Sequence, residues 1–187
     1  MIKSPVFSAY ERREALMSIW EGEDRMEAIY QNLLQASQEA IQAKQAPTIR
    51  DLEAVWSRYK YLVLEYSPRH YQAIRQVLKD KTAYPDQALF DYLAQALAQP
   101  LDTATHVNAY DHVWGHFKKL ATDQEKAHYL DLRQAFLAQQ VDRQAIKSYL
   151  NQLSKTYQDK YLNQSYFFYG MDKSIPLWRK LIKQACK

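Results

Sequence analysis

The sequence predicts an all-α fold, a compact multi-helix bundle, and three observations support this prediction. Apolar residues recur at helical spacing along almost the whole chain. Only three of the 187 residues are glycine, whereas sheets use glycine freely in their turns. Proline and short polar residues stand where helices would begin. With 47% hydrophobic and 25% charged residues, the composition is that of a globular protein with one well-packed core.

The N-terminal region, residues 1–46, is expected to form one or two helices, broken near Gly22, that pack as an extension on a body spanning residues 47–187. The two parts are expected to form one structural unit. Thr48 followed by Asp51 resembles a capping box, so a helix should run from there to about Tyr66. Its apolar and aromatic side chains fall within roughly a 120° arc, the width of a core-facing stripe. They are Leu52, Val55, Trp56, Tyr59, Leu62, Val63 and Tyr66.

Each later helix is predicted to begin at a capping residue or a proline. Ser67 and Pro68 fit the N-cap and the first position of a helix that ends near residue 79. A further helix should begin at Pro85 and end before Pro100. The remaining predicted helices are one from Asp102 or Thr103 to about residue 121, one from the capping box Thr122–Glu125 to about Gln139, one from Asp142 through Tyr157, and a short basic one from Ser174 and Pro176.

Composition and motifs argue against several kinds of site and location. The single cysteine, Cys186, cannot form an intrachain disulfide, a redox pair or an iron–sulfur cluster. No G-x-G-x-x-G or P-loop pattern is present, and no cofactor is expected. No apolar run reaches about 18 residues, and the N-terminus lacks the apolar segment of a signal peptide. We therefore expect a cytoplasmic protein that does not enter a membrane.

The charge is unevenly distributed between the N-terminal third and the rest of the chain. Residues 1–54 contain six Lys/Arg and nine Asp/Glu, whereas the remaining residues contain 19 and 12. A basic body favours an anionic partner, with nucleic acid or a nucleotide as the class to consider. A normal solvated surface is the alternative explanation of the same charges.

The predicted helix over residues 103–121 carries three of the five histidines. His106 falls in the middle of the apolar face, which predicts a hydrogen-bonded core histidine. His112 and His116 lie four residues apart on the opposite face, a spacing that allows two imidazoles to bind one metal ion. No third ligand is indicated, so this is a weak metal site, and surface or interhelical packing is the alternative.

Gly115 is unexpected in the interior of this predicted helix, because a glycine there costs about 1 kcal/mol relative to alanine. Close approach of another helix or of a ligand is the usual compensation. We therefore expect Asn108, His112 and Gly115 to form a covered polar face, either a tight helix crossing or the floor of a small pocket.

Fifteen tyrosines are a high number for this length. Tyrosine can stack on nucleic-acid bases, and it also fills cores and their margins. Arg58, Lys60 and Tyr61 lie off the apolar stripe of their helix. They are candidates for holding an anion, with simple solvation as the alternative.

Three segments resemble, in order, the bacterial YbgA family, a domain of unknown function. They are Ser57–Pro68 with Tyr71, similar to R-[HY]-K-Y-L-L-L-A-H-S-P…Y; His106–Lys118, similar to H-x-N-V-L-x-H-x-x-G-Y-F-K; and Tyr161–Phe167, similar to Y-L-x-Q-x-Y-[FL]. The likeness spans roughly residues 50–170. The positions that match are Arg58, Lys60, Ser67, Tyr71, His106, Asn108, His112, Gly115, Phe117, Lys118, Tyr161, Gln164 and Tyr166.

The sequence departs from the family pattern at several positions. Glu65 and Tyr66 replace Ala-His, His116 replaces a tyrosine, and residues 168–170 replace Pro-Tyr-Pro. The change at His116 argues against an obligatory histidine pair for metal. YbgA proteins are often fused to a cysteine-rich domain that resembles thiouracil desulfidases. The resemblance therefore implies an accessory role near nucleobase or sulfur chemistry, with an iron–sulfur desulfidase-like protein as a partner.

Three hypotheses about function follow. The first is a binding or accessory module for nucleic acid, a nucleotide or a partner enzyme. Its candidate binding residues are Arg58, Lys60, Tyr61, Asn108, His112, Gly115, Lys118 and Gln164. The second is a small enzyme in which His112 acts as acid and base while Arg58 or Lys60 holds an anionic substrate. The third is a structural homo-oligomer of helices.

Overall fold

The computed structural model describes residues 29–168, and every regular element in this range is helical, which confirms the predicted all-α class. A helical segment covers residues 29–42. The elements that follow are α2 (Ile49–Tyr66), α3 (Pro68–Val77), α4 (Asp86–Leu97), α5 (Thr103–Trp114), α6 (Asp123–Leu137) and α7 (Arg143–Thr156), then the short 3-10 helices η1 (Leu162–Gln164) and η2 (Tyr166–Phe168).

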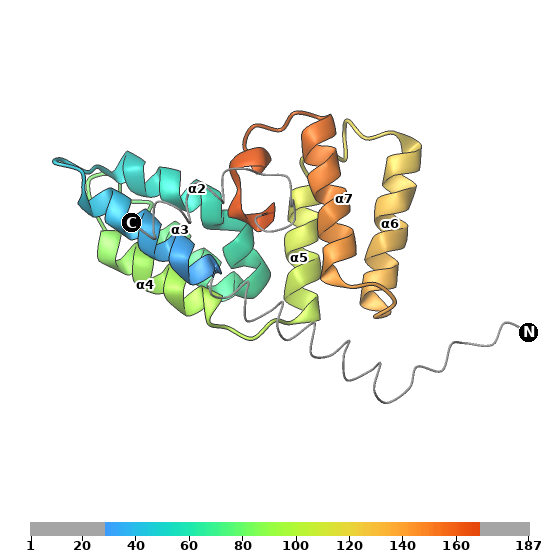
Figure 1. Cartoon of the computed structure of the whole chain (residues 1–187), viewed down its shortest axis with the longest axis horizontal. Helices are drawn as coiled ribbons and strands as arrows, with labels where there is room; N and C mark the ends of the chain where they lie inside the picture. Colours follow the sequence, from blue (N-terminus) through green and yellow to red (C-terminus); the bar gives the residue numbers. More distant parts are fainter. Residues whose placement is uncertain (1–28, 169–187) are drawn as a thin grey trace, which may run out of the picture.

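The helices form two neighbouring groups (Figure 1). The first contains α2, α3, α4 and the 29–42 segment, and the second contains α5, α6 and α7. Helix α2 joins the groups because it packs against α3 and α4 and also against α5 and η2. Its inward side chains, such as Leu62 and Val63, are fully buried, as are Tyr110 on α5 and Leu150 on α7. One apolar core therefore runs through both groups.

The predicted starts of the helices from Thr48 to Asp142 are confirmed. The Asp51 carboxylate accepts the Thr48 backbone N–H at 2.8 Å, and Ser67 caps α3 with Pro68 following. Helix α4 begins directly after Pro85. The starts of α5, α6 and α7 are capped by Asp102, Thr122 and Asp142, each accepting a backbone N–H of its own first turn. These caps are local, so sequence alone identifies them.

The predicted end of the histidine-bearing helix is wrong. Helix α5 ends at Trp114, and residues 115–120 continue as turns rather than as α-helix. Beyond this point Phe117 and Ala121 are still buried, whereas Leu120 is 62% exposed, so helical spacing no longer tells which apolar residues face the core. The end of α5 is held against α6 by Trp114, whose ring stacks on Tyr129 at 4.4 Å between centres, and by Asp111, which accepts hydrogen bonds from Arg133 and from the Tyr129 hydroxyl.

Several predictions lie wholly or partly outside the described residues. They concern the helix around Gly22, the C-terminal helix from Ser174 and Cys186. The described part of the N-terminal region packs on α2, because Tyr30 contacts Tyr66 edge to face and the Ser37 hydroxyl lies 3.2 Å from the Tyr59 hydroxyl. Among the described helices, none combines the length and apolar character needed to cross a membrane.

Candidate functional site: a basic groove beside α2 and α3

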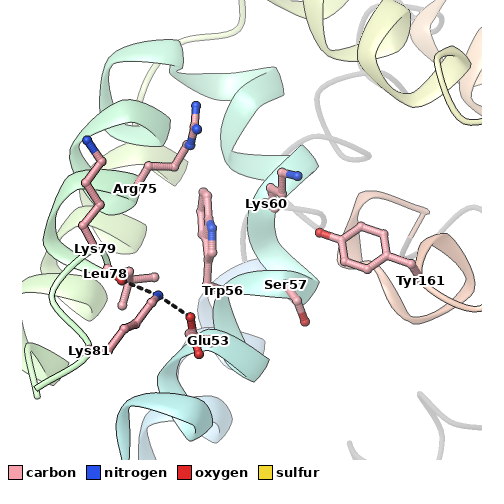
Figure 2. A pocket seen from close by; sticks show the side chains of 9 residues that line it. All are labelled: Glu53, Trp56, Ser57, Lys60, Arg75, Leu78, Lys79, Lys81 and Tyr161. Atoms are coloured by element: carbon pink, nitrogen blue, oxygen red, sulfur yellow. Dashed lines mark hydrogen bonds and ion pairs between the residues drawn. The ribbon is translucent and has the colours of Figure 1, made fainter.

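A groove with a cavity volume of about 470 Å³ lies between α2, the C-terminal end of α3 and the segment before η1. Figure 2 shows Trp56 with Arg75, Lys79 and Lys81 on one side and Lys60 on the other, and the Tyr161 hydroxyl directed toward Lys60. We call this site the basic groove. It is lined by Glu53, Trp56, Ser57, Lys60, Arg75, Leu78, Lys79, Lys81 and Tyr161.

Helical spacing explains how these side chains meet. Glu53, Trp56 and Lys60 are three and four residues apart on α2, so they share one face of that helix. Arg75 belongs to the last turn of α3, where a positive charge is favourable at the negative end of the helix dipole. Lys79 and Lys81 follow α3 directly. The face of α2 with Lys60, the last turn of α3 with Arg75 and the segment after α3 with Lys79 and Lys81 thus place four basic residues around one hollow.

Aromatic rings support and border the basic groove. Tyr71 on α3 is buried, and its ring centre lies 5.5 Å from that of Trp56 on α2. The Arg75 guanidinium lies 5.7 Å from the Tyr71 ring centre, within cation–π distance. Tyr161 borders the groove with 37% of its surface exposed. The groove therefore combines positive charge with exposed aromatic surface.

The positive charge of the basic groove is largely uncompensated. Among residues 29–168, Lys81 pairs with Glu53 and also donates to the Leu78 carbonyl at 2.7 Å, whereas Lys60, Arg75 and Lys79 have no carboxylate partner within 4 Å. Partial burial, with a contribution from Arg75, lowers the pKa of Lys60. Unpaired cations that repel one another are stabilised by an anion, so the arrangement suits an anionic ligand.

Lys60 also lies beside Tyr61, which belongs to a series of three hydrogen-bonded side chains, Tyr61, His116 and Asp159. Its Nζ lies 5.1 Å from the ring centre of Tyr61 and 5.8 Å from that of Tyr161. The Tyr61 hydroxyl lies 2.7 Å from His116 Nε2, and His116 Nδ1 lies 2.8 Å from Asp159 Oδ2. An ionised carboxylate can only accept hydrogen bonds, so His116 Nδ1 carries the proton that it donates to Asp159. In neutral His116, Nε2 then has no proton and accepts the hydrogen bond from the Tyr61 hydroxyl.

Partial removal from solvent raises the pKa values of both tyrosines. Burial, the neighbouring Tyr71 and Asp159 together raise the pKa of Tyr161 to about 12. Burial is also the main reason that the pKa of Tyr61 is raised well above its usual range. Both hydroxyls are therefore protonated at neutral pH and can act as hydrogen-bond donors.

Of the eight predicted binding residues, Lys60 alone lines the basic groove. Tyr61 contacts it from behind through Lys60 and Tyr161. Arg58 is exposed and donates to the Tyr166 hydroxyl at 3.4 Å, away from this lining. Lys118 and Gln164 are exposed, and neither contributes to the groove. The groove therefore combines one predicted binding residue, Lys60, with three cations that were not predicted, Arg75, Lys79 and Lys81.

The expected covered polar face on α5 is wrong. His112 and Gly115 are exposed and Asn108 is half-buried. Gly115 ends the helix with φ −52° and ψ −26°, and the nearest atoms to a Cβ built there are carbonyl atoms of its own turn, the closest at 3.0 Å. No atom of another described helix lies within 3.9 Å of that carbon. The helix ends where we predicted that it would continue, which removes the reason for expecting such an approach.

His112 and His116 also take different environments. His112 Nδ1 donates to the carbonyl of Asn108 in the same helix at 2.8 Å, whereas both nitrogens of His116 are engaged by Tyr61 and Asp159. Within the described part of the chain, no three or more metal-ligating acidic, histidine or cysteine side chains gather at one point. The predicted pair thus separates because the backbone leaves the helical path after Trp114.

The core position of His106 is confirmed. It is 5% exposed, its ring lies parallel to Phe136, and its Nδ1 is 3.4 Å from the Tyr110 hydroxyl. Tyr110 donates to Glu65 at 3.0 Å, and Lys147 donates to the same carboxylate at 2.6 Å. We call His106, Tyr110, Glu65 and Lys147 the buried polar cluster. It joins α2, α5 and α7 inside the core.

The sequence analysis missed most of the groove lining. Trp56 was assigned to the core stripe, but it is only partly buried. Arg75, Lys79 and Lys81 formed a signal that could have been noticed, since three basic residues surround the predicted end of one helix. Tyr161 could not be assigned to the same site, because it is far from these residues in sequence.

Comparison with known proteins places the chain in a family without an assigned function. A family model described as "Protein of unknown function (DUF1722)" matches residues 60–170, more than half of the chain. The chain belongs to the DUF1722 family. The DUF1722 match includes Lys60, Arg75, Lys79 and Tyr161 but begins after Trp56. No curated protein and no solved structure matches the chain significantly.

Proposed function

We propose that this DUF1722 protein is a binding module whose basic groove takes a phosphate-bearing ligand, either a nucleotide or a strand of nucleic acid. The observation that carries the proposal is the convergence of Lys60, Arg75 and Lys79, without a carboxylate partner among the described residues, beside exposed aromatic surface. Such concave positive surfaces attract anions. The cavity volume of about 470 Å³ is in the range of small-ligand sites.

Binding across a salt series tests this proposal. Labelled single-stranded oligonucleotides are followed by fluorescence anisotropy, and nucleoside triphosphates by calorimetry, from low to physiological salt. Each cation that contacts a phosphate of a strand should add about 0.7 to the slope of log affinity against log salt. The variants K60A, R75A and K79A should each weaken binding and reduce that slope.

A matched control is K126A. Lys126 lies on α6, pairs with Asp123 and does not line the groove, so its removal should leave binding unchanged. If wild-type protein binds neither probe at low salt, or if K126A weakens binding as much as the groove variants, the proposal is wrong.

The enzyme alternative has less support. It requires His112 and Arg58 or Lys60 around one substrate, yet the basic groove contains Lys60 without His112 or Arg58. His112 instead donates to its own helix, and Arg58 contacts Tyr166. Binding therefore accounts for the groove better than acid–base catalysis by His112.

Other parts of the proposal rest on composition and on the YbgA resemblance. They are a cytoplasmic location, an iron–sulfur desulfidase-like partner with a link to nucleobase or sulfur chemistry, and assembly into a homo-oligomer. Light scattering of the purified protein tests the oligomer. Copurification with a cysteine-rich protein that shows the absorbance of an iron–sulfur cluster tests the partner.

A further inference from the structure

Tyr161 is the part of the basic groove that indicates which kind of anion fits. It borders the groove with 37% of its surface exposed, and its hydroxyl is directed toward Lys60. A site for phosphate alone gains little from a large exposed ring, because phosphates are bound by charge and hydrogen bonds. An exposed ring beside cations suits a ligand that carries both a phosphate and a flat aromatic group.

The inner side of the Tyr161 ring rests on aromatic neighbours. The ring lies nearly parallel to that of His116, at 6.0 Å between centres and 14° between planes. It meets Tyr61 edge to face, also at 6.0 Å. His116 cannot turn freely, because Tyr61 and Asp159 engage both of its ring nitrogens. The ring of Tyr161 is thus supported by a side chain that is itself held in place.

The backbone that carries Tyr161 is held by the same carboxylate. Asp159 uses Oδ2 for His116 and accepts the Leu162 backbone N–H on Oδ1 at 2.9 Å, while Leu162 is fully buried. The turn before it is formed by Gln158, which has a φ of 50°, in the left-handed region that a non-glycine residue seldom adopts. Asp159 donates its own N–H to the Ser154 carbonyl. Both ends of the short segment around Tyr161 are therefore fixed before any ligand arrives.

We propose that Tyr161 is a stacking platform for a nucleobase, and that His116 and Asp159 are positioning residues that hold this platform beside Lys60. This inference rests on the proposed function and specifies its ligand: a phosphate joined to a base, rather than phosphate alone. Because the ring is held in place beforehand, stacking does not cost the entropy of ordering it. The Lys60 ammonium, 5.8 Å from the ring centre, reaches a phosphate attached to the stacked group.

The test compares probes that have the same charge with and without a base. Adenosine triphosphate is compared with inorganic tripolyphosphate, and a short single strand is compared with an abasic strand of the same length. Base stacking on one aromatic side chain is expected to give about a tenfold effect. Y161L should therefore weaken both base-containing probes about tenfold and leave both base-free probes unchanged, whereas K60A should weaken all four.

His116 is tested through Tyr161. H116F removes both hydrogen bonds of that side chain, so it should weaken the base-containing probes, but it should have no further effect in a Y161L background. D159N retains an oxygen for the Leu162 N–H and should weaken these probes less than D159A. Circular dichroism melts check that each variant is folded.

The outcomes separate the two proposals. Base-dependent loss in Y161L, for the nucleotide or for the strand, supports the stacking platform and shows which source of nucleobase the groove prefers. Equal losses for probes with and without a base, or no loss in a folded Y161L, overturn the platform while leaving phosphate binding intact. An H116F effect that persists in the Y161L background overturns the positioning role. Failure of all four probes to bind wild-type protein overturns the proposed function itself.

Discussion

Two lysines show how differently this fold treats the same side chain. Lys147 on α7 is 4% exposed and donates at 2.6 Å to Glu65, which is fully buried and also accepts from Tyr110. Lys60 on α2 is half-buried and lacks a carboxylate partner among the described residues. The first lysine is committed to the core. The second is available to a ligand. The contrast shows that the presence of a buried carboxylate partner, rather than the residue type, separates a structural lysine from a candidate binding lysine.

The buried polar cluster should give the largest effect on stability. In E65A the ammonium of Lys147 keeps its buried position and loses its counter-charge, which costs about 3–5 kcal/mol of unfolding free energy. Urea unfolding followed by circular dichroism measures this loss. The double variant E65L/K147M replaces the pair by apolar side chains and should recover most of the stability. A loss of less than about 1 kcal/mol in E65A would show that the pair is not the buried contact described here.

The matched change at the groove should affect binding rather than folding. K60M keeps the aliphatic stem of Lys60 beside Tyr61 and Tyr161 and removes the charge, so unfolding free energy should stay within about 0.5 kcal/mol of wild type. Affinity for a single-stranded oligonucleotide at low salt should fall severalfold. K147M, by contrast, should lower the unfolding free energy, because it leaves the buried Glu65 carboxylate without its partner. If K60M destabilises the protein as much as K147M does, Lys60 is a structural residue and the contrast between the two lysines is wrong.

A smaller effect should appear in the pH dependence of stability. Burial lowers the pKa of His106 below its usual 6.5, an effect opposed in part by Glu65 and reinforced by Lys147 and Arg143. The unfolded chain therefore binds a proton more readily than the folded one, so stability contributed by neutral His106 declines as the pH falls below about 6.5. Unfolding free energies from pH 8 to pH 5 measure the slope.

In H106Q this part of the slope should disappear. H112Q provides the control, because His112 is exposed on the same helix. The same slope in wild type and H106Q would show that burial of His106 makes no contribution.

The smallest effect is expected at Gly115, the exposed residue at which α5 ends. The residue has helical dihedral angles, so alanine is allowed, although its Cβ would lie only 3.0 Å from the His112 carbonyl oxygen. Reduced freedom of the unfolded chain and this local crowding oppose each other, and G115A should change stability by less than about 1 kcal/mol. A loss of several kcal/mol in thermal or urea unfolding would restore the idea of a tight approach at this position.

The fold could be predicted because its signals are local in sequence. The site could not, because its side chains contact residues that are distant in sequence. Caps such as Thr48 with Asp51 and Thr122 with Glu125 act over three residues, so they were found from sequence. The end of α5 was misplaced because apolar residues continue at helical spacing after Trp114, whereas the α-helical backbone ends there. His116 was consequently assigned beside His112, whereas its true partners, Tyr61 and Asp159, are 55 and 43 residues away.

The sequence by itself determined the all-α class, the starts of the helices and the burial of His106, since helical periodicity and capping are written in neighbouring residues. Only the tertiary structure decided which charges are paired. It buried Lys147 against Glu65, brought Lys60 together with Arg75, Lys79 and Tyr161, and turned His116 toward Asp159. The physical reason is that electrostatic and stacking interactions act over a few ångströms in space, a distance that separation along the chain does not report.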